Sequence, residues 1–303
     1  MINEVAIDPK VLLEWSKDRR DYRDFIRDYG IGTPRIVSSF PKANFKNLKK
    51  YLLRKTDTLS NDLDKKRYTE MVGYLDKNLY LRDAAQNSSE DWYELIVNET
   101  IDFDVVIAKE NFPCNNVISL DKLYDSEFQF LKHQISFKRT PFDFVESIKG
   151  FIHLTTSKIV IIDAFCHQKN AMITIHKIID EIKNRKFKSQ NVEVLIIYKD
   201  NPKNKHQKVP EPFFFRQSFE RIIGSIPDDI TLNIIQLRES ENSDVFHNRY
   251  IMNDVGGITI GHGLDLSDAE GATDEVTLLG KDIYEKRWKQ FVTQIKFDIV
   301  SSA

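Results

Sequence analysis

Apolar residues in the second half of the chain fall into short continuous runs, and these runs alternate with amphipathic segments. Such runs predict buried strands, and amphipathic segments with a helical period predict helices. The predicted strands are 158–162, 192–198 and 230–237, and the predicted helices are 171–182, 213–223 and 281–295. Strands that alternate with helices are typical of a sheet buried between helical layers. The pattern therefore predicts an α/β sandwich. We find no internal repeat, so one such unit is expected.

The first half has a less regular pattern. Residues 11–29 place apolar side chains on one helical face, and a cluster of Gly30, Gly32 and Pro34 ends the segment. The predicted helices are 11–29, 42–55 and 61–84, and the predicted strands are 35–37, 104–108 and 117–119. This mixture indicates a mixed α/β or largely helical N-terminal domain of unknown role. We place the boundary near residue 130, which gives domains 1–130 and 131–303.

Composition narrows the class of protein only a little. Hydrophobic residues make up 41% and charged residues 30% of the 303 residues, as in ordinary globular proteins. The net charge of -2 gives no global argument for a nucleic-acid binder, so local patches must supply one. The chain has two cysteines, Cys114 and Cys166, whose spacing is not that of metal ligands. They argue against a disulfide framework and against a structural zinc site. No signal peptide or membrane-spanning run is evident, so we expect a cytoplasmic protein.

The segment Val245–Asp265 is the most informative part of the chain. Its alternating apolar residues predict two short strands joined at Gly256–Gly257. His247 and Arg249 are two residues apart, so they would lie on one face of a strand. An imidazole beside a permanent cation is suited to holding a phosphate and attacking it. Asp254 is expected either to orient one of these groups or to cap the turn before the glycines.

The spacing of His247, Asp254 and Gly261 resembles the signature of the phospholipase D superfamily, His-x-Lys-x4-Asp-x6-Gly-Ser-x-Asn. Arg249 stands at the position of the signature lysine, and His262 stands at the position of its serine. The resemblance implies a mechanism with two histidines. One histidine forms a phosphohistidine, and the other protonates the leaving oxygen and later activates water. Neither a metal nor a cofactor is implied.

The end of the motif departs from that signature. Leu264 replaces the asparagine, and residues 260–265 are more similar to the phospholipase D-like C-terminal domain of the MIT-domain proteins. The Asp-Pro-Tyr-like turn of that branch has a counterpart in residues 163–165, with the sequence Asp-Ala-Phe. The resemblance covers roughly residues 134–303 and implies a phospholipase D-like α/β sandwich with one motif. That branch is understood mainly as a set of binding domains.

Further site candidates surround the motif. Asp163 follows the first strand of the unit and is expected either to hydrogen-bond His247 or to serve as a helix cap or loop carboxylate. His167 and His262 are candidates for the second histidine, which a symmetric dimer partner could also supply. Asp265 could replace the missing asparagine. The residues expected to contact the substrate are Gly261, His262, Asp265, His167, Lys199, Lys203 and Lys205.

Two basic segments could contact an anionic partner. The loop 199–208 is rich in lysine and is either a nucleic-acid or lipid contact or a solvated loop. The segment 42–55 has a basic face that could dock on nucleic acid or an anionic membrane, or it could simply pack on the core. Its basic residues are Lys42, Lys46, Lys49, Lys50, Arg54 and Lys55, and it contains no acidic residue.

Together these patterns predict a metal-independent phospholipase D-like phosphodiesterase of the nuclease type. We expect it to act on nucleic acid as a homodimer, and by analogy alone a role in bacterial phage defence would suit it. The alternative is a catalytically inactive module that binds nucleic acid, phospholipid or a protein partner. A third possibility is a scaffold subunit whose partner performs the chemistry.

Overall fold

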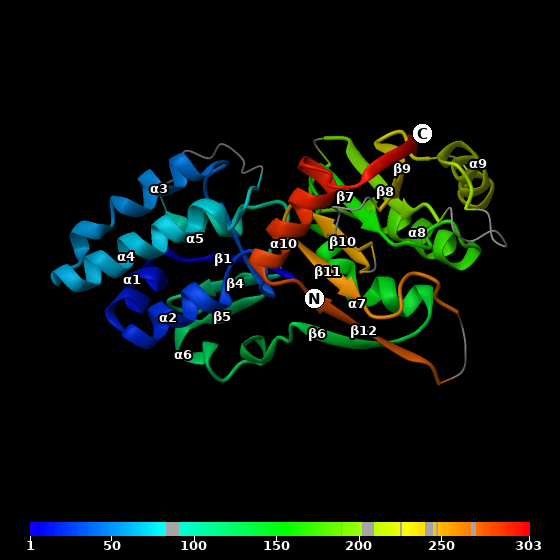
Figure 1. Cartoon of the computed structure of the whole chain (residues 1–303). Helices are drawn as coiled ribbons and strands as arrows, with labels where there is room; N and C mark the ends of the chain where they lie inside the picture. Colours follow the sequence, from blue (N-terminus) through cyan, green and yellow to red (C-terminus); the bar gives the residue numbers. More distant parts are fainter. Residues whose placement is uncertain are drawn as a thin grey trace. The chain divides into compact units, whose positions relative to one another are not determined.

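The computed structural model describes residues 1–82, 91–188, 190–201, 209–224, 226–239, 245–246, 248–267 and 271–303. The chain divides into two compact units, Ile2–Lys132 and His133–Ala303 (Figure 1). Each unit has its own sheet, and the whole is a mixed α/β protein. In the part of the chain that the structure describes, none of the helices combines the length and apolar composition needed to cross a lipid bilayer.

The N-terminal unit is built on a five-stranded parallel sheet with the order β3-β2-β1-β4-β5. Its strands are β1 (Asn3–Ile7), β2 (Arg35–Ser38), β3 (Leu79–Tyr80), β4 (Val105–Ala108) and β5 (Val117–Ser119). Its helices are α1 (Pro9–Lys17), α2 (Arg19–Asp28), α3 (Phe45–Leu53), α4 (Asp62–Tyr74), α5 (Trp92–Val97) and α6 (Leu120–Leu123). An all-parallel sheet is covered on both faces, and two separate clusters of buried apolar side chains accordingly pack on it.

Two predicted helices of this unit are wrong in extent. The segment 11–29 contains two helices because Asp18 between them is extended (φ −104°, ψ 134°), and its carboxylate accepts hydrogen bonds from the backbone N–H groups of Arg20 and Asp21. The segment 61–84 is helical only to Tyr74, after which a short 3₁₀ turn leads to β3. Local capping and the parallel pairing of β3 explain both differences.

A buried ion pair holds β1 to the chain after β3. The side chains of Glu4 and Arg82 are both 0% exposed, and Nη1 of Arg82 lies 2.8 Å and 2.9 Å from the two carboxylate oxygens. The same guanidinium donates to the carbonyl of Ile101 and lies 3.9 Å from the ring centroid of Phe103. A buried charge is tolerated because its partner and these further contacts compensate it.

The C-terminal unit is built on an eight-stranded mixed sheet with the order β13-β9-β8-β7-β10-β11-β12-β6. β7, β8 and β9 are parallel, and the remaining pairs are antiparallel. Its strands are β6 (Gln134–Lys138), β7 (Lys158–Ile162), β8 (Val192–Lys199), β9 (Ile230–Arg238), β10 (Tyr250–Asn253), β11 (Gly256–Ile260), β12 (Thr273–Leu278) and β13 (Asp298–Ser302). Its helices are α7 (Pro141–His153), α8 (Lys169–Ile182), α9 (Pro212–Ile223) and α10 (Lys281–Trp288), and a π-helical turn Lys289–Thr293 follows α10.

The central strands of this unit were predicted from their apolar runs, and β7, β8 and β9 confirm them. Ile159 to Ile162 are all fully buried, which explains why β7 reads as a continuous run and not as an alternation. The junction predicted at Gly256–Gly257 is wrong, because the turn of the β10–β11 hairpin lies at Asp254–Val255 and both glycines belong to β11. A Cβ atom on Gly257 would lie 2.9 Å from Cδ1 of Leu279, so this glycine permits close packing.

We expect Arg82→Ala to lower the free energy of unfolding by about 3–5 kcal/mol, because the buried carboxylate of Glu4 and that of Glu99, 3.6 Å from Nη2 of Arg82, would both lose this guanidinium. The double variant Glu4→Leu/Arg82→Met removes one of the two carboxylates together with the guanidinium and should recover part of this loss. Chemical denaturation followed by circular dichroism measures both. If the double variant were as unstable as the single one, packing and not charge would account for the effect.

Candidate functional site

Asp163 and Arg249 meet at one edge of the C-terminal sheet. β10 runs antiparallel to β7 with Tyr250 opposite Ile162, so the residues that flank this pair lie side by side where β7 ends. Nε of Arg249 lies 3.6 Å from Oδ1 of Asp163. Arg249 precedes β10 by one residue, so the prediction that it lies within a strand is wrong. The carboxyl ends of parallel strands are where open α/β sheets place their sites.

Asp163 is a buried carboxylate that fixes two loops. It is 1% exposed. Its Oδ1 accepts a hydrogen bond from the backbone N–H of Phe165 at 2.9 Å, and its Oδ2 accepts one from Leu264 at 2.8 Å. Burial raises the pKa of Asp163, and the two backbone donors and Arg249 oppose that rise. The carboxylate therefore joins the end of β7 to the segment after β11.

Gly263 allows this close approach. Its φ is +88°, and a Cβ atom there would lie 2.5 Å from Nε of Arg249 and 2.6 Å from Oδ2 of Asp163. Any side chain would strain the backbone and displace the ion pair. Nη1 of Arg249 also donates to the carbonyl of Gly261 at 3.2 Å. The guanidinium is thus held by the Asp163 carboxylate on one side and by the Gly261 carbonyl on the other.

His262 forms a histidine–carboxylate pair at the same edge. Its Nδ1 lies 3.2 Å from Oδ1 of Asp274, and its backbone N–H donates to Oδ2 at 3.2 Å. Asp274 is buried, whereas the His262 side chain is 74% exposed. A carboxylate beside Nδ1 favours the tautomer that leaves Nε2 free as a base. Sequence reasoning missed Asp274, because β12 had no recognisable signal.

The neighbouring segment is tied to this pair. Nη2 of Arg139, which follows β6, donates to the carbonyl of Asp265 at 3.0 Å, and its Nε lies 3.9 Å from Oδ2 of Asp274. A Cβ atom on Gly261 would lie 2.9 Å from Oδ1 of Asp274. Gly261 is therefore bound to Arg249, His262 to Asp274 and Asp265 to Arg139, and the contact shown for Asp265 uses its backbone and not its carboxylate.

His167 and Lys199 lie on the same edge but have different surroundings. His167 follows the Asp163 loop, its Nδ1 is buried without a hydrogen-bond partner among the described residues, and burial lowers its pKa. Nζ of Lys199 lies 2.6 Å from Oε1 of Glu239, and this oxygen also accepts the backbone N–H of Phe246 at 2.6 Å. The charge of Lys199, predicted to meet substrate, is thus paired within the unit and anchors the chain just before the motif.

Asp254 lies at the opposite end of β10 from Arg249. Its Oδ2 accepts hydrogen bonds from the backbone N–H groups of Thr156 and Ser157 at 2.9 Å and 2.8 Å, and its Oδ1 accepts one from the Ser157 hydroxyl at 2.7 Å. The structure does not bring Asp254 together with Asp163 and Arg249. Asp254 itself lies in the hairpin turn before Gly256, but its carboxylate holds the separate turn at 156–158 and not the turn that it was expected to cap.

Three predicted residues, His247, Lys203 and Lys205, lie outside the described residues. The neighbours of His247 are described. Phe246 packs 5.6 Å from the ring centroids of both Phe291 and Phe297, and the side-chain amide of Asn248 donates to the Tyr250 hydroxyl at 2.8 Å. The chain on both sides of His247 is thus anchored to the unit.

Phe165 is a further residue of this edge. Its backbone N–H donates to Asp163, and the residue is 45% exposed. Sequence analysis noted it only as the counterpart of a turn tyrosine. Among the described residues, no cluster of three or more His, Cys, Asp or Glu side chains is arranged to hold a metal ion.

Comparison with known proteins gives little. No family model and no curated protein matches the chain. Among solved structures, it is similar to that of TrmBL2, an archaeal chromatin protein described as showing a novel mode of DNA binding. The TM-score is 0.30 at 11% identity, over 59% of this chain and 61% of that chain. The chain thus spans less than two thirds of that protein, and a likeness at this TM-score defines no shared fold.

We expect Gly263→Ala to lower the free energy of unfolding by about 2–4 kcal/mol, since backbone strain adds to a clash with Arg249 and Asp163. Gly271→Ala is the matched control. Its φ is +75°, but a Cβ atom there would have none of the described residues within 4 Å, so only the strain of about 1 kcal/mol should appear. Denaturation curves measure both variants. Equal losses would show that the close approach at Gly263 has no energetic consequence.

Asp254→Ala should lower the free energy of unfolding by about 2–3 kcal/mol, because the turn at 156–158 would lose its charged acceptor. Any phosphodiester cleavage by the folded variant should remain near the wild-type rate. Asp62→Ala, at an exposed position in the first turn of α4, is the control and should leave stability nearly unchanged. Loss of cleavage in a fully folded Asp254→Ala variant would return Asp254 to the catalytic residues.

Proposed function

We propose that the C-terminal unit is a phospholipase D-like phosphodiesterase that acts on single-stranded nucleic acid. One observation carries this proposal. The guanidinium of Arg249 is fixed at the sheet edge between Asp163 and the Gly261 carbonyl. It stands two residues after His247 in sequence, and its partner Gly261 directly precedes His262. A charged fork, a nucleophile and an acid–base group are the parts that phosphodiester cleavage needs.

Arg249 would bind the phosphate. Among the described residues the structure shows one hydrogen bond from its guanidinium, so further N–H groups remain for the two non-bridging oxygens. Asp163 holds the side chain in place and partly balances its charge in the absence of substrate. Because the guanidinium is already ordered, little conformational freedom is lost when a phosphate binds.

Two imidazoles would perform the chemistry. A ring nitrogen of His247 attacks phosphorus, the phosphorus–oxygen bond to the leaving group breaks, and protonated His262 gives its proton to that oxygen. His262 then takes a proton from a water molecule, which attacks the phosphohistidine and releases a phosphate monoester and free His247. Asp274, 3.2 Å from Nδ1 of His262, orients this ring so that Nε2 can act as the acid in the first step and as the base in the second. One chain would thus contain both histidines, and a dimer partner would not be required.

The exposed ring of Phe165 supports nucleic acid as the substrate class. It lies on the loop that Asp163 fixes, so a base could stack on it while the adjoining phosphate meets Arg249. Stacking on an exposed aromatic side chain is a common way of holding single strands without sequence preference.

Binding without turnover is the second candidate. Three residues, Arg249, His262 and Leu264, depart from the superfamily signature, and this favours binding without turnover. Arg249 could still hold a phosphate, because that contact needs neither the lysine, the serine nor the asparagine of the signature. Leu264 is buried at the signature asparagine position, so its side chain offers no hydrogen bond to a substrate. Such a module would bind nucleic acid, phospholipid or a protein partner through the same edge.

The test incubates the full-length protein with labelled single-stranded DNA, duplex DNA and single-stranded RNA in EDTA. His247→Ala should abolish cleavage, and His262→Ala should slow it about 10²–10⁴-fold through loss of the acid–base group. Arg249→Ala should slow it about 10²–10³-fold, whereas Arg249→Lys should keep part of the activity. Phe165→Ala should weaken single-strand binding with little effect on the maximal rate.

His176→Ala is the matched control. His176 forms a similar pair with Asp180 at 3.3 Å on α8, so its loss removes a histidine–aspartate contact without altering the edge. If wild type and His247→Ala bind single strands equally and neither cleaves, the binding module is the correct function. Full activity in His262→Ala, together with a dimer in sedimentation, would instead assign the second histidine to the partner chain.

A further inference from the structure

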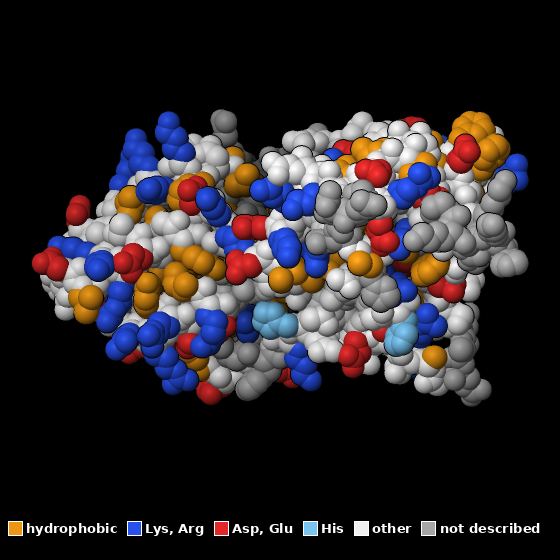
Figure 2. Space-filling model, in the orientation of Figure 1, with side chains coloured by type: hydrophobic (Ala, Val, Ile, Leu, Met, Phe, Trp, Pro, Cys, Tyr) orange, Lys and Arg blue, Asp and Glu red, His pale blue; other side chains and the backbone are white. Residues whose placement is uncertain are grey.

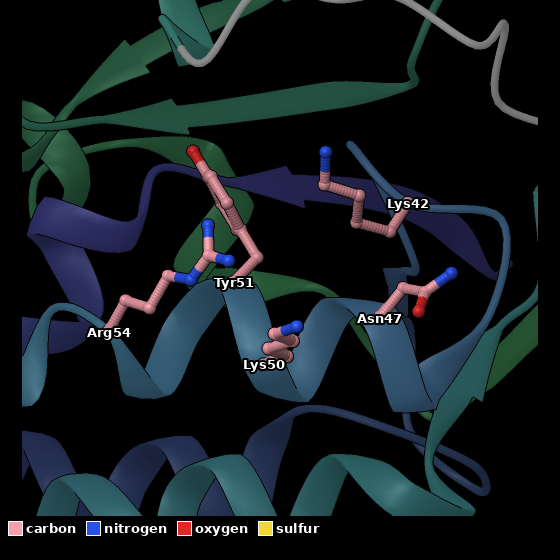
Figure 3. Close-up of a pocket in the computed structure, with 5 residues that line it drawn as sticks. All are labelled: Lys42, Asn47, Lys50, Tyr51 and Arg54. Atoms are coloured by element: carbon pink, nitrogen blue, oxygen red, sulfur yellow. The ribbon is translucent and has the colours of Figure 1, made fainter.

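A pocket of about 240 Å³ lies against α3 in the N-terminal unit, and its lining is basic (Figure 3). The lining residues are Lys42, Asn47, Lys50, Tyr51 and Arg54. The last four are spaced i, i+3, i+4 and i+7, so they share one face of the helix. Lys42 reaches the same side from the loop that follows β2.

The described lining of this pocket has an excess of positive charge. Among the described residues that line it, three of five are cations and none is a carboxylate. Nζ of Lys42 and Nζ of Lys55 lie 5.3 Å and 5.2 Å from the centroid of the Tyr51 ring, which gathers the cations further. Figure 2 shows Lys and Arg side chains over α3. Cations brought together in this way repel one another, so an anion in the pocket would be bound favourably.

A second pocket, of about 260 Å³, shares Tyr51 with the first. Aromatic rings of Tyr51, Trp92 and Tyr93 line it, with Lys10 5.0 Å above the Tyr93 ring. The rest of its lining is Asp8, Pro9, Lys55 and Asp91. Flat rings beside carboxylates suit an aromatic body that carries hydroxyl groups.

The second pocket lies beside the carboxyl end of β1, the strand at which the strand order of the parallel sheet reverses. Asp8 directly follows β1, and its Oδ2 accepts hydrogen bonds from the Tyr93 hydroxyl at 2.7 Å and from the backbone N–H of Lys109, after β4, at 3.4 Å. β1 lies between β2 and β4, so the chain leaves β1 toward one side and later returns to pair on the other. Open parallel sheets bind ligands beyond their carboxyl ends at such switch points.

We propose that the two pockets bind a nucleoside phosphate. The phosphate would occupy the basic pocket, on Lys42, Lys50 and Arg54, and the base and sugar would lie beyond Tyr51 against the aromatic rings. A small ligand fits better than a polynucleotide, because Lys49, also on α3, takes no part in either pocket. A strand that tracked the helix as a whole would use its outer cations as well.

Isothermal titration of the full chain tests this site with ADP, AMP, adenosine and inorganic pyrophosphate as probes. ADP and AMP should bind saturably, and adenosine should bind at least tenfold more weakly than AMP. Lys50→Glu should weaken ADP binding at least tenfold. Lys49→Glu, which makes the same charge change about 100° further round the helix, should alter it less than twofold.

Three outcomes would overturn the proposal. Absence of saturable binding of both nucleotides would show that the pocket does not hold this class of ligand. Pyrophosphate binding as tight as ADP would show that the aromatic pocket is not used. Equal losses in Lys49→Glu and Lys50→Glu, together with tighter binding of a single-stranded oligonucleotide, would make the basic helix a polynucleotide surface instead.

Discussion

A single buried carboxylate organises the C-terminal site. Asp163 directly follows the central strand β7, accepts hydrogen bonds from the backbone N–H groups of Phe165 and Leu264, and pairs with Arg249. Because a buried charge must be compensated, each of these partners is drawn to one point. At position 263 only glycine fits beside Asp163 and Arg249 without displacing this ion pair. The position of the Arg249 guanidinium therefore follows from the need to satisfy one buried acid.

Sequence reasoning found the elements whose burial leaves a clear pattern. β7 and most of β8 are buried on both faces, β9 is buried mainly on one face, and all three were predicted almost to the residue. β1 was missed because Asn3 and Glu4 interrupt its apolar run, and Glu4 is acceptable there only because Arg82 arrives from far along the chain. No local window contains that partner. The predicted strands β2, β4 and β5 could not be joined into one parallel sheet without β1, which lies between β2 and β4.

The candidate site likewise contains residues that local sequence signals revealed and residues that they did not. The motif identified Arg249 and His262, and the end of β7 identified Asp163, since both signals are local in sequence. Asp274 could not be found, because its role depends on how β12 pairs with β11. Asp254 belongs to the motif by spacing, yet the hairpin carries it to the other end of β10. The spacing of the motif therefore identified residues of the candidate site, but it did not show which of them lie close together in the fold.

The edge strand β6 sets a limit on how the C-terminal unit can be cut from the chain. It pairs with β12 from Thr273 to Thr277, and Arg139 just after it binds the carbonyl of Asp265. A fragment that began at β7 would expose β12 as a new edge and remove the neighbour of Asp274. Expression boundaries for this unit therefore belong before Gln134, ahead of every strand that the apolar pattern of the sequence reveals in it.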